Sequence, residues 1–281
     1  MTFPQVDAVL HWLSAASTTN TSSLDKPSAL KATATATATS DGRTVIITDE
    51  VRAEGGFLLN HFLSRHLRAD DQEWKVVLVG VAQTLGHYGA VGKKLGLNIA
   101  AYQQTGKLTF IDALSGLSGK RSPLARDETH VLRDLFTNIE AASHTSSGVH
   151  PHKLCLVIDD ISAFSYCGIQ ANQTAAFITN CLKLVSQTNG CFVGLLHDAN
   201  ALEKDLPDLS RLSKAILHKA DYVLHVRMLE SGATQGVDGQ VSFCRGPLLS
   251  RDVPFHPEVL HYQITDAHVQ FFKKGFSKGL L

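Results

Sequence analysis

Two acidic residues end one of the most apolar stretches of the chain, KLCLVIDD at residues 153–160. An apolar strand that ends in acids is typical of enzymes that hydrolyse nucleotides, where such a carboxylate holds Mg²⁺. Aspartate in this position is also a common helix cap. Because two carboxylates alone hold Mg²⁺ weakly, we favour structural roles for Asp159 and Asp160 in this Walker-B-like position.

The turn that should carry a phosphate-binding lysine has none. A working phosphate loop follows a strand with the pattern GxxxxGK[ST]; its backbone N–H groups and lysine bind phosphate, and its hydroxyl binds Mg²⁺. The first predicted strand, TVIITD at 44–49, leads into DEVRAEGGF at 49–57. With Gly55 as the second glycine, Glu50 takes the first glycine position, Gly56 the lysine position and Phe57 the hydroxyl position. We therefore predict a degenerate phosphate-loop position, no catalytic residue and no cofactor.

Two alternatives place an enzyme activity on the same strand ends. An autonomous ATPase would need an atypical phosphate site, and Asp49, Glu50 and Glu54 would repel phosphate there by on the order of 1 to 4 kcal/mol per close charge pair. A hydrolase could use His197 and Asp198, which end the strand predicted at 191–198. No nucleophile motif such as GxSxG accompanies that pair, which makes it a weak catalytic candidate.

Composition limits the other function classes. Of 281 residues, 26 are basic and 26 acidic, so nucleic-acid binding would need a local patch. Five cysteines without CxxC spacing indicate buried free thiols, and the scattered histidines predict no metal site. No apolar run reaches the roughly 18 residues of a membrane span, so we expect a soluble intracellular protein without membrane contact.

Strands and helices alternate through most of the chain. Apolar strands predicted at 44–49, 74–81, 107–114, 153–160 and 191–198 are separated by helical patterns such as 56–68 and 128–143, which indicates a parallel sheet covered on both faces. Alternating strands at 222–229, 240–246, 259–265 and 268–274 predict an antiparallel extension of one edge. The predicted organisation is an N-terminal helix at 1–15, a disordered Ser/Thr/Ala-rich insertion at 16–42 and one α/β domain at 43–281.

Five separated segments carry a family resemblance from about residue 43 to the end: NHFLS (60–64), HYGAVGKKLGLN (87–98), LVIDDIS (156–162), LLHD (195–198) and YQITDAHVQFFKKGFSKGLL (262–281). Together they resemble the family of the sixth Elongator subunit, which has a RecA-like fold without a usable phosphate loop. The resemblance implies a non-catalytic subunit of a heterohexameric ring, with two copies each of this chain and of the fourth and fifth Elongator subunits. It also implies cooperation with the catalytic Elongator core in modifying wobble uridines of tRNA at position 5, in the cytoplasm, with a nuclear pool left open.

The resemblance directs attention to basic residues of the later loops and strands. In the loop HDANALEKDLPDLSRLSK (197–214), the candidates for tRNA contact are Lys204, Arg211 and Lys214. Three acids lie among them, so an ordinary solvated helix face is the alternative.

Two arginines and two aromatic residues are further candidates. Arg227 and Arg245, on late strands, are candidates for reaching a neighbour's nucleotide in trans, with pairing to carboxylates as the alternative. Phe164 and Tyr166, in the loop 161–173, could stack on bases or pack within the protein.

Overall fold

The computed structural model describes Val6 and residues 43–50, 52–69, 74–118, 128–144, 153–197, 207–232, 234, 236–265 and 268–273. The predicted N-terminal helix and the predicted insertion lie outside these residues except for Val6. Val6 is fully buried in the core.

One nine-stranded sheet organises the chain, in the order β3-β2-β4-β5-β1-β6-β7-β8-β9. Neighbouring strands from β3 to β6 pair in parallel, and β6 to β9 pair antiparallel. The predicted parallel sheet with an antiparallel C-terminal edge is confirmed. The strands are β1 (Arg43–Asp49), β2 (Trp74–Gly80), β3 (Leu108–Asp112), β4 (Lys153–Asp159), β5 (Cys191–His197), β6 (Tyr222–Arg227), β7 (Gly239–Arg245), β8 (Glu258–Ile264) and β9 (Val269–Lys273).

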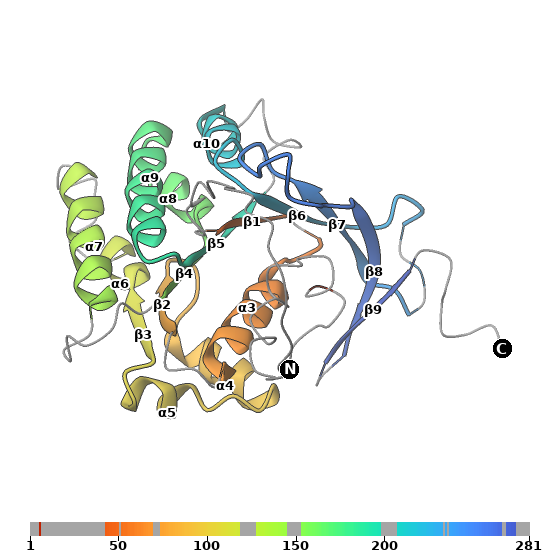
Figure 1. Cartoon of the computed structure of the whole chain (residues 1–281), viewed down its shortest axis with the longest axis horizontal. Helices are drawn as coiled ribbons and strands as arrows, with labels where there is room; N and C mark the ends of the chain where they lie inside the picture. The colour runs from red at the N-terminus through yellow and green to blue at the C-terminus, as the bar shows by residue number, and fades with distance from the viewer. Residues whose placement is uncertain are drawn as a thin grey trace, which may run out of the picture.

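Helices cover both faces of the parallel part of the sheet (Figure 1). One face carries α3 (Gly56–Arg68), α4 (Leu85–Lys94) and α5 (Ile99–Gln104). The other carries α6 (Ala113–Ser118), α7 (Glu128–Ser143), α8 (Ser162–Tyr166), α9 (Ala171–Gln187) and α10 (Pro207–Leu217). Among the described residues, no helix is both long enough and apolar enough to cross a membrane.

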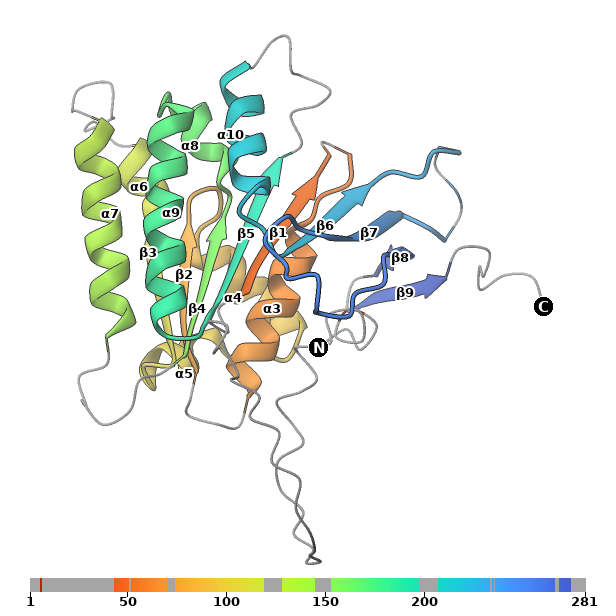
Figure 2. The same ribbon diagram turned by 45° about the horizontal axis from the view of Figure 1, so that its top comes forward.

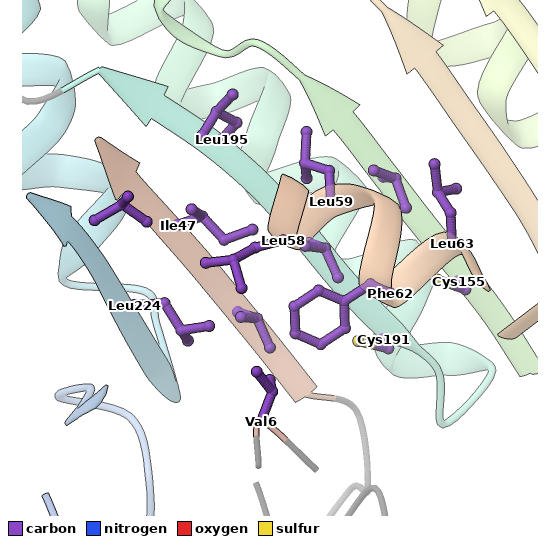
Figure 3. Packing of buried hydrophobic residues seen from close by; sticks show 14 of the residues in the cluster. Val6, Ile47, Leu58, Leu59, Phe62, Leu63, Cys155, Cys191, Leu195 and Leu224 are labelled. Carbon is purple, nitrogen blue, oxygen red and sulfur yellow. The ribbon is translucent and has the colours of Figure 1, made fainter. Parts of the chain in front are cut away.

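Helix α3 fixes the geometry of the turn that precedes it. Its apolar residues recur at helical spacing, and Leu58, Phe62 and Leu63 face β1, β5 and β4 (Figure 3). Each is at most 2% exposed, and full burial of such a side chain stabilises the fold by about 1.5 to 3 kcal/mol. The helix is therefore held against the sheet, and its N-terminus is held at the end of β1.

The antiparallel strands extend the same core beyond α3. On one face, Val241, Phe243, Leu260 and Tyr262 are almost fully buried. The ring of Phe57, in the first turn of α3, lies 4.8 Å from the ring of Tyr262. The residue aligned with the phosphate-loop hydroxyl is thus an apolar anchor between α3 and the C-terminal strands.

Candidate functional site

The candidate site lies where β1, β4 and β5 end. These strands are neighbours in the sheet, and Asp49 of β1 is directly paired in register with His197 of β5. Asp159 ends β4 and Asp160 follows it. Because the carboxyl ends of parallel strands form one edge, this is the place where open α/β sheets bind their ligands.

A histidine bridges two carboxylates at the centre of this edge. His197 Nδ1 lies 2.5 Å from Asp49 Oδ1, and its Nε2 lies 3.0 Å from Asp160 Oδ2. Both carboxylates are at most 3% exposed, whereas the imidazole is 40% exposed. Hydrogen bonds to Asp160 and then Asp49 raise the pKa of His197 to about 10, so the ring is an imidazolium at neutral pH and donates from both nitrogens.

The turn before α3 is closed by the same aspartate. The backbone N–H of Gly55 donates to Asp49 Oδ2 at 2.7 Å. In a phosphate loop such an N–H group faces an anionic ligand, whereas here the chain's own carboxylate accepts from it. A Cβ on Gly55 would lie 2.9 Å from Ile47 Cγ2 and 3.1 Å from Leu195 Cδ1, so the turn lies directly on the ends of β1 and β5.

Asp159 has different hydrogen-bond partners from Asp49 and Asp160. Its carboxylate accepts from the Tyr88 hydroxyl of α4, and its carbonyl accepts from the N–H groups of Val81 and Ala82 at 2.6 and 3.0 Å. Burial raises the pKa of Asp159 to about 6, although the hydrogen bond from Tyr88 opposes that rise. Burial, and then the charge of Asp159 and its hydrogen bond, raise the pKa of Tyr88. Asp159 thus joins β4 to α4 and to the end of β2.

Asp160 closes the turn into α8. Its Oδ1 accepts from the N–H of Ser162 at 2.6 Å, and Ser162 Oγ accepts from the N–H of His197 at 2.8 Å. Both carboxylate oxygens therefore have protein donors. Within the described ranges, no group of three or more His, Cys, Asp or Glu side chains is arranged to hold a metal ion. The arrangement fits the structural role that we favoured for this pair.

The predicted RNA-contact residues do not share one loop. Lys204 lies outside the described residues, and Arg211 and Lys214 are exposed on α10, so the prediction of a loop at these two positions is wrong. Arg211 lies 3.6 Å from Asp208 Oδ1. Asp208 also accepts from the N–H of Ala171 at 2.8 Å and thereby ties α10 to the start of α9.

The two candidate arginines have different environments. Arg227 Nε lies 3.8 Å from Glu50 Oε1, and both side chains are about half exposed. The Arg245 guanidinium donates to the carbonyls of Leu249, Ser250 and Val253 at 3.3, 2.7 and 2.6 Å. Arg245 thus holds the chain's own loop after β7, and this geometry does not favour a reach in trans.

The two aromatic candidates, Phe164 and Tyr166, differ in their exposure to solvent. Phe164 is fully buried, with its ring 5.6 Å from that of Phe177, so it packs within the protein and does not stack on bases. Tyr166 is 55% exposed beside the strand ends, and nearby Asp160 and Asp49 add to the burial that raises its pKa.

Sequence reasoning missed one member of this site, Tyr88. It named His197 but paired it with Asp198, which lies outside the described residues, and did not predict its contacts with Asp49 and Asp160. The sequence carried one usable signal: Asp49 and His197 both end predicted strands. Their pairing depends on β1 and β5 being neighbours in the sheet, and the residues of either strand alone do not determine the strand order.

Comparisons with known proteins agree on the family. The family model of Elongation complex protein 6 matches residues 27–266. Elongator complex protein 6 of Xenopus laevis is 30% identical over 256 residues, which cover 85% of this chain and 93% of the relative. The protein of that name from Homo sapiens is 29% identical over 260 residues, with the same coverage of each chain, 85% and 93%.

A solved structure supports the fold. A KaiC-like protein from Pyrococcus horikoshii superposes with a TM-score of 0.52 at 12% identity, covering 82% of this chain and 89% of that one. This likeness confirms the predicted RecA-like α/β fold and shows nothing further. With the family model matching most of its length, the chain belongs to the Elongation complex protein 6 family.

Proposed function

We propose that this chain is a non-catalytic, RecA-like subunit of the Elongator complex that works by assembly. In this proposal it forms the accessory heterohexameric ring with the fourth and fifth subunits, two copies of each. The ring supports the catalytic core in modifying wobble uridines of tRNA at position 5. Family membership and the absence of a phosphate-binding lysine and hydroxyl after β1 support this role.

The observation that supports a non-catalytic role is that polar groups at the strand ends already bind one another. Asp49 accepts from Gly55 N–H and from the His197 imidazolium, so the chain's own carboxylate stands where an anionic ligand would be bound. A triphosphate would have to displace that carboxylate without a lysine to compensate its charge. Two close unit charges repel by about 1 to 4 kcal/mol at intermediate dielectric, which opposes nucleotide binding.

The hydrolase alternative receives no support from the same geometry. Both ring nitrogens of His197 already bind carboxylates, which leaves neither to activate a serine or cysteine. Ser162 is fully buried, and its hydroxyl accepts from a backbone N–H rather than facing the imidazole.

Contact with tRNA within the ring belongs to this proposal, with Arg211 and Lys214 as exposed candidates on α10. Arg227 is the better of the two candidates for reaching a neighbouring subunit, because its pairing with Glu50 is long and half exposed. No cofactor is required of this chain. We place the protein in the cytoplasm and leave a nuclear pool open.

Co-expression with the two partner subunits, followed by native mass measurement, tests the proposal. The expected result is one assembly with two copies of each chain, and with no bound nucleotide that depends on this subunit. A chain that remains alone under conditions where its two partners associate with each other would contradict the ring role.

A further inference from the structure

Positive charge gathers at the end of the molecule opposite the candidate site. From Trp74 to Ile111 the chain carries four lysines and no carboxylate. The last turn of α3 adds Arg65 and Arg68, and the last turn of α4 contains two of the lysines, Lys93 and Lys94. Figure 2 shows α5 below the sheet, at the end away from the arrowheads of β1 and β5.

Hydrogen bonds join these cationic segments into one surface. The Arg68 guanidinium donates to the carbonyls of Leu95 and Gly96 at 2.8 and 3.2 Å, which brings the end of α3 against the end of α4. Lys107, just before β3, donates from Nζ to the carbonyl of Ala69 at 2.5 Å. The cations at residues 68, 93, 94 and 107 therefore belong to one end of the molecule, although they come from three segments.

Helix capping accounts for only part of this charge. Lysine and arginine are favoured at helix C-termini, where they bind the last carbonyls, and Arg68 does so. Lys93 and Lys94 are exposed, and neither ammonium group has a hydrogen bond or ion pair among the described residues. The sequence between Arg65 and Lys107 contains six basic and three acidic residues, so a local excess of positive charge remains in a chain that is neutral overall.

We propose that this surface, the basic end, formed by Arg68, Lys93, Lys94 and Lys107, binds the phosphate backbone of RNA. The inference rests on the proposed function, which brings tRNA to the assembly. It assigns the tRNA contact to a different surface from the one that contains the candidates Arg211 and Lys214 on α10.

The chemistry around the basic end favours a nucleic-acid backbone over other anionic partners. The exposed neighbours Asn98, Gln104 and Thr105 offer polar groups without negative charge. The large exposed apolar residues of the described chain lie on α8, on β8 and in the loop after β7, and none belongs to the segments that form the basic end. An interfacial membrane helix or an amphipathic peptide gains much of its affinity from such apolar contacts, whereas phosphate backbones bind through charge and hydrogen bonds.

A pair of charge reversals tests the inference, with unmodified tRNA transcript titrated into both the full chain and the co-expressed assembly. Lys93→Glu/Lys94→Glu should weaken RNA binding about tenfold at 50 mM salt, and should flatten the slope of log affinity against log salt by roughly 1.5. Arg133→Glu/Lys183→Glu, at exposed positions of α7 and α9, is the matched control and should change the affinity less than twofold. Lys93→Gln/Lys94→Gln avoids placing negative charge at the C-terminus of α4; it should flatten the salt slope by about the same amount, because the same two phosphate contacts are lost, and should weaken binding less than the charge reversal does.

The outcomes separate this inference from the proposed function. If the assembly carrying Lys93→Glu/Lys94→Glu forms and binds tRNA as well as the wild type, the inference about the basic end is wrong and the proposed function is unaffected. Equal weakening by the control pair also overturns the inference, because the effect would then be one of net charge. Polyglutamate or phosphatidylserine vesicles that compete as well as RNA, at equal total charge, would reject the assignment to RNA. If no ring forms, the proposed function fails, and the titration of the full chain still decides the inference.

Discussion

Replacing His197 with glutamine should destabilise the protein at neutral pH and have little effect near pH 10. The pKa of His197 rises from 6.5 to about 10 in the folded state. A histidine with a raised pKa stabilises the fold fully below its unfolded value, and that contribution fades as pH rises through the folded value. The stabilisation is therefore complete below about pH 6.5 and is lost between there and pH 10.

The size of the effect follows from the exposure of the ring. Each unit of pKa shift corresponds to about 1.4 kcal/mol, but the imidazole is 40% exposed, and solvent screening reduces its interactions. We expect a loss of about 2 kcal/mol at pH 6.5 for His197→Gln, because two buried carboxylates lose their only described cation. For a domain of this size, that corresponds to a fall in Tm of about 4 to 8 °C.

Urea unfolding at pH 6.5, 8 and 10 measures this directly. His256→Gln, in the loop between β7 and β8, is the matched control, because that histidine is exposed and makes no described side-chain contact. Adding Asp49→Asn and Asp160→Asn to His197→Gln should recover part of the loss by removing the uncompensated charges. A loss that is the same at all three pH values would refute the imidazolium bridge, and so would a loss no larger than that of the control.

Three further substitutions test other contacts. Asp159→Asn should stabilise the protein by about 1 kcal/mol at pH 7.5, because a carboxyl group with a pKa of about 6 is destabilising when it is ionised in the folded protein. Thermal unfolding should show this gain in stability shrinking as the pH falls from 6 toward 4. Gly55→Ala should destabilise the protein by about 1 to 3 kcal/mol, because the added Cβ would lie 2.9 and 3.1 Å from core side chains. The control is Gly56→Ala, whose Cβ would meet nothing within 4 Å; it should be neutral or stabilising in the same denaturation series. Arg245→Ala should cost about 1 to 2 kcal/mol and speed proteolysis of the loop after β7, while the exposed Arg251→Ala should do neither.

Two of the longer helices could be predicted from periodicity. The bounds predicted for α3 and α7, 56–68 and 128–143, agree with the structure. Helix α10 occupies part of the segment predicted as a loop at 197–214, and it agrees with the solvated helix face that is the alternative for Arg211 and Lys214. The signal was present in Leu209, Leu212 and Ile216, which recur at helical spacing after Pro207 and are buried.

The short helices gave a weaker signal. Helix α5 has only six residues, and its clearest mark is Asn98, whose side chain accepts from the N–H of Ala101 at 3.1 Å. A single capping residue without a following apolar period does not distinguish a helix from a turn. Such elements are determined by tertiary packing more than by local preference.

For the site, the sequence predicts which phosphate-binding groups are missing but not how the residues that are present contact one another. The missing lysine and hydroxyl follow from the residues alone, and so does the position of the acids at strand ends. The bridge between Asp49, His197 and Asp160 depends on the order of strands β4, β5 and β1, which is a long-range property of the sheet. The sequence therefore predicts that a nucleotide is not held, but it does not predict which residues are joined at the strand ends.

Nucleotide titration of the purified chain tests the central claim most directly. Calorimetry with ATP and excess Mg²⁺ should give no saturable heat up to 1 mM, in the wild type and in His197→Gln alike, because the turn before α3 contains neither the lysine nor the hydroxyl residue of a phosphate loop. Micromolar, Mg²⁺-dependent binding by the wild-type chain alone would contradict the account, since it would require the Gly55 N–H to leave Asp49 and cradle a phosphate.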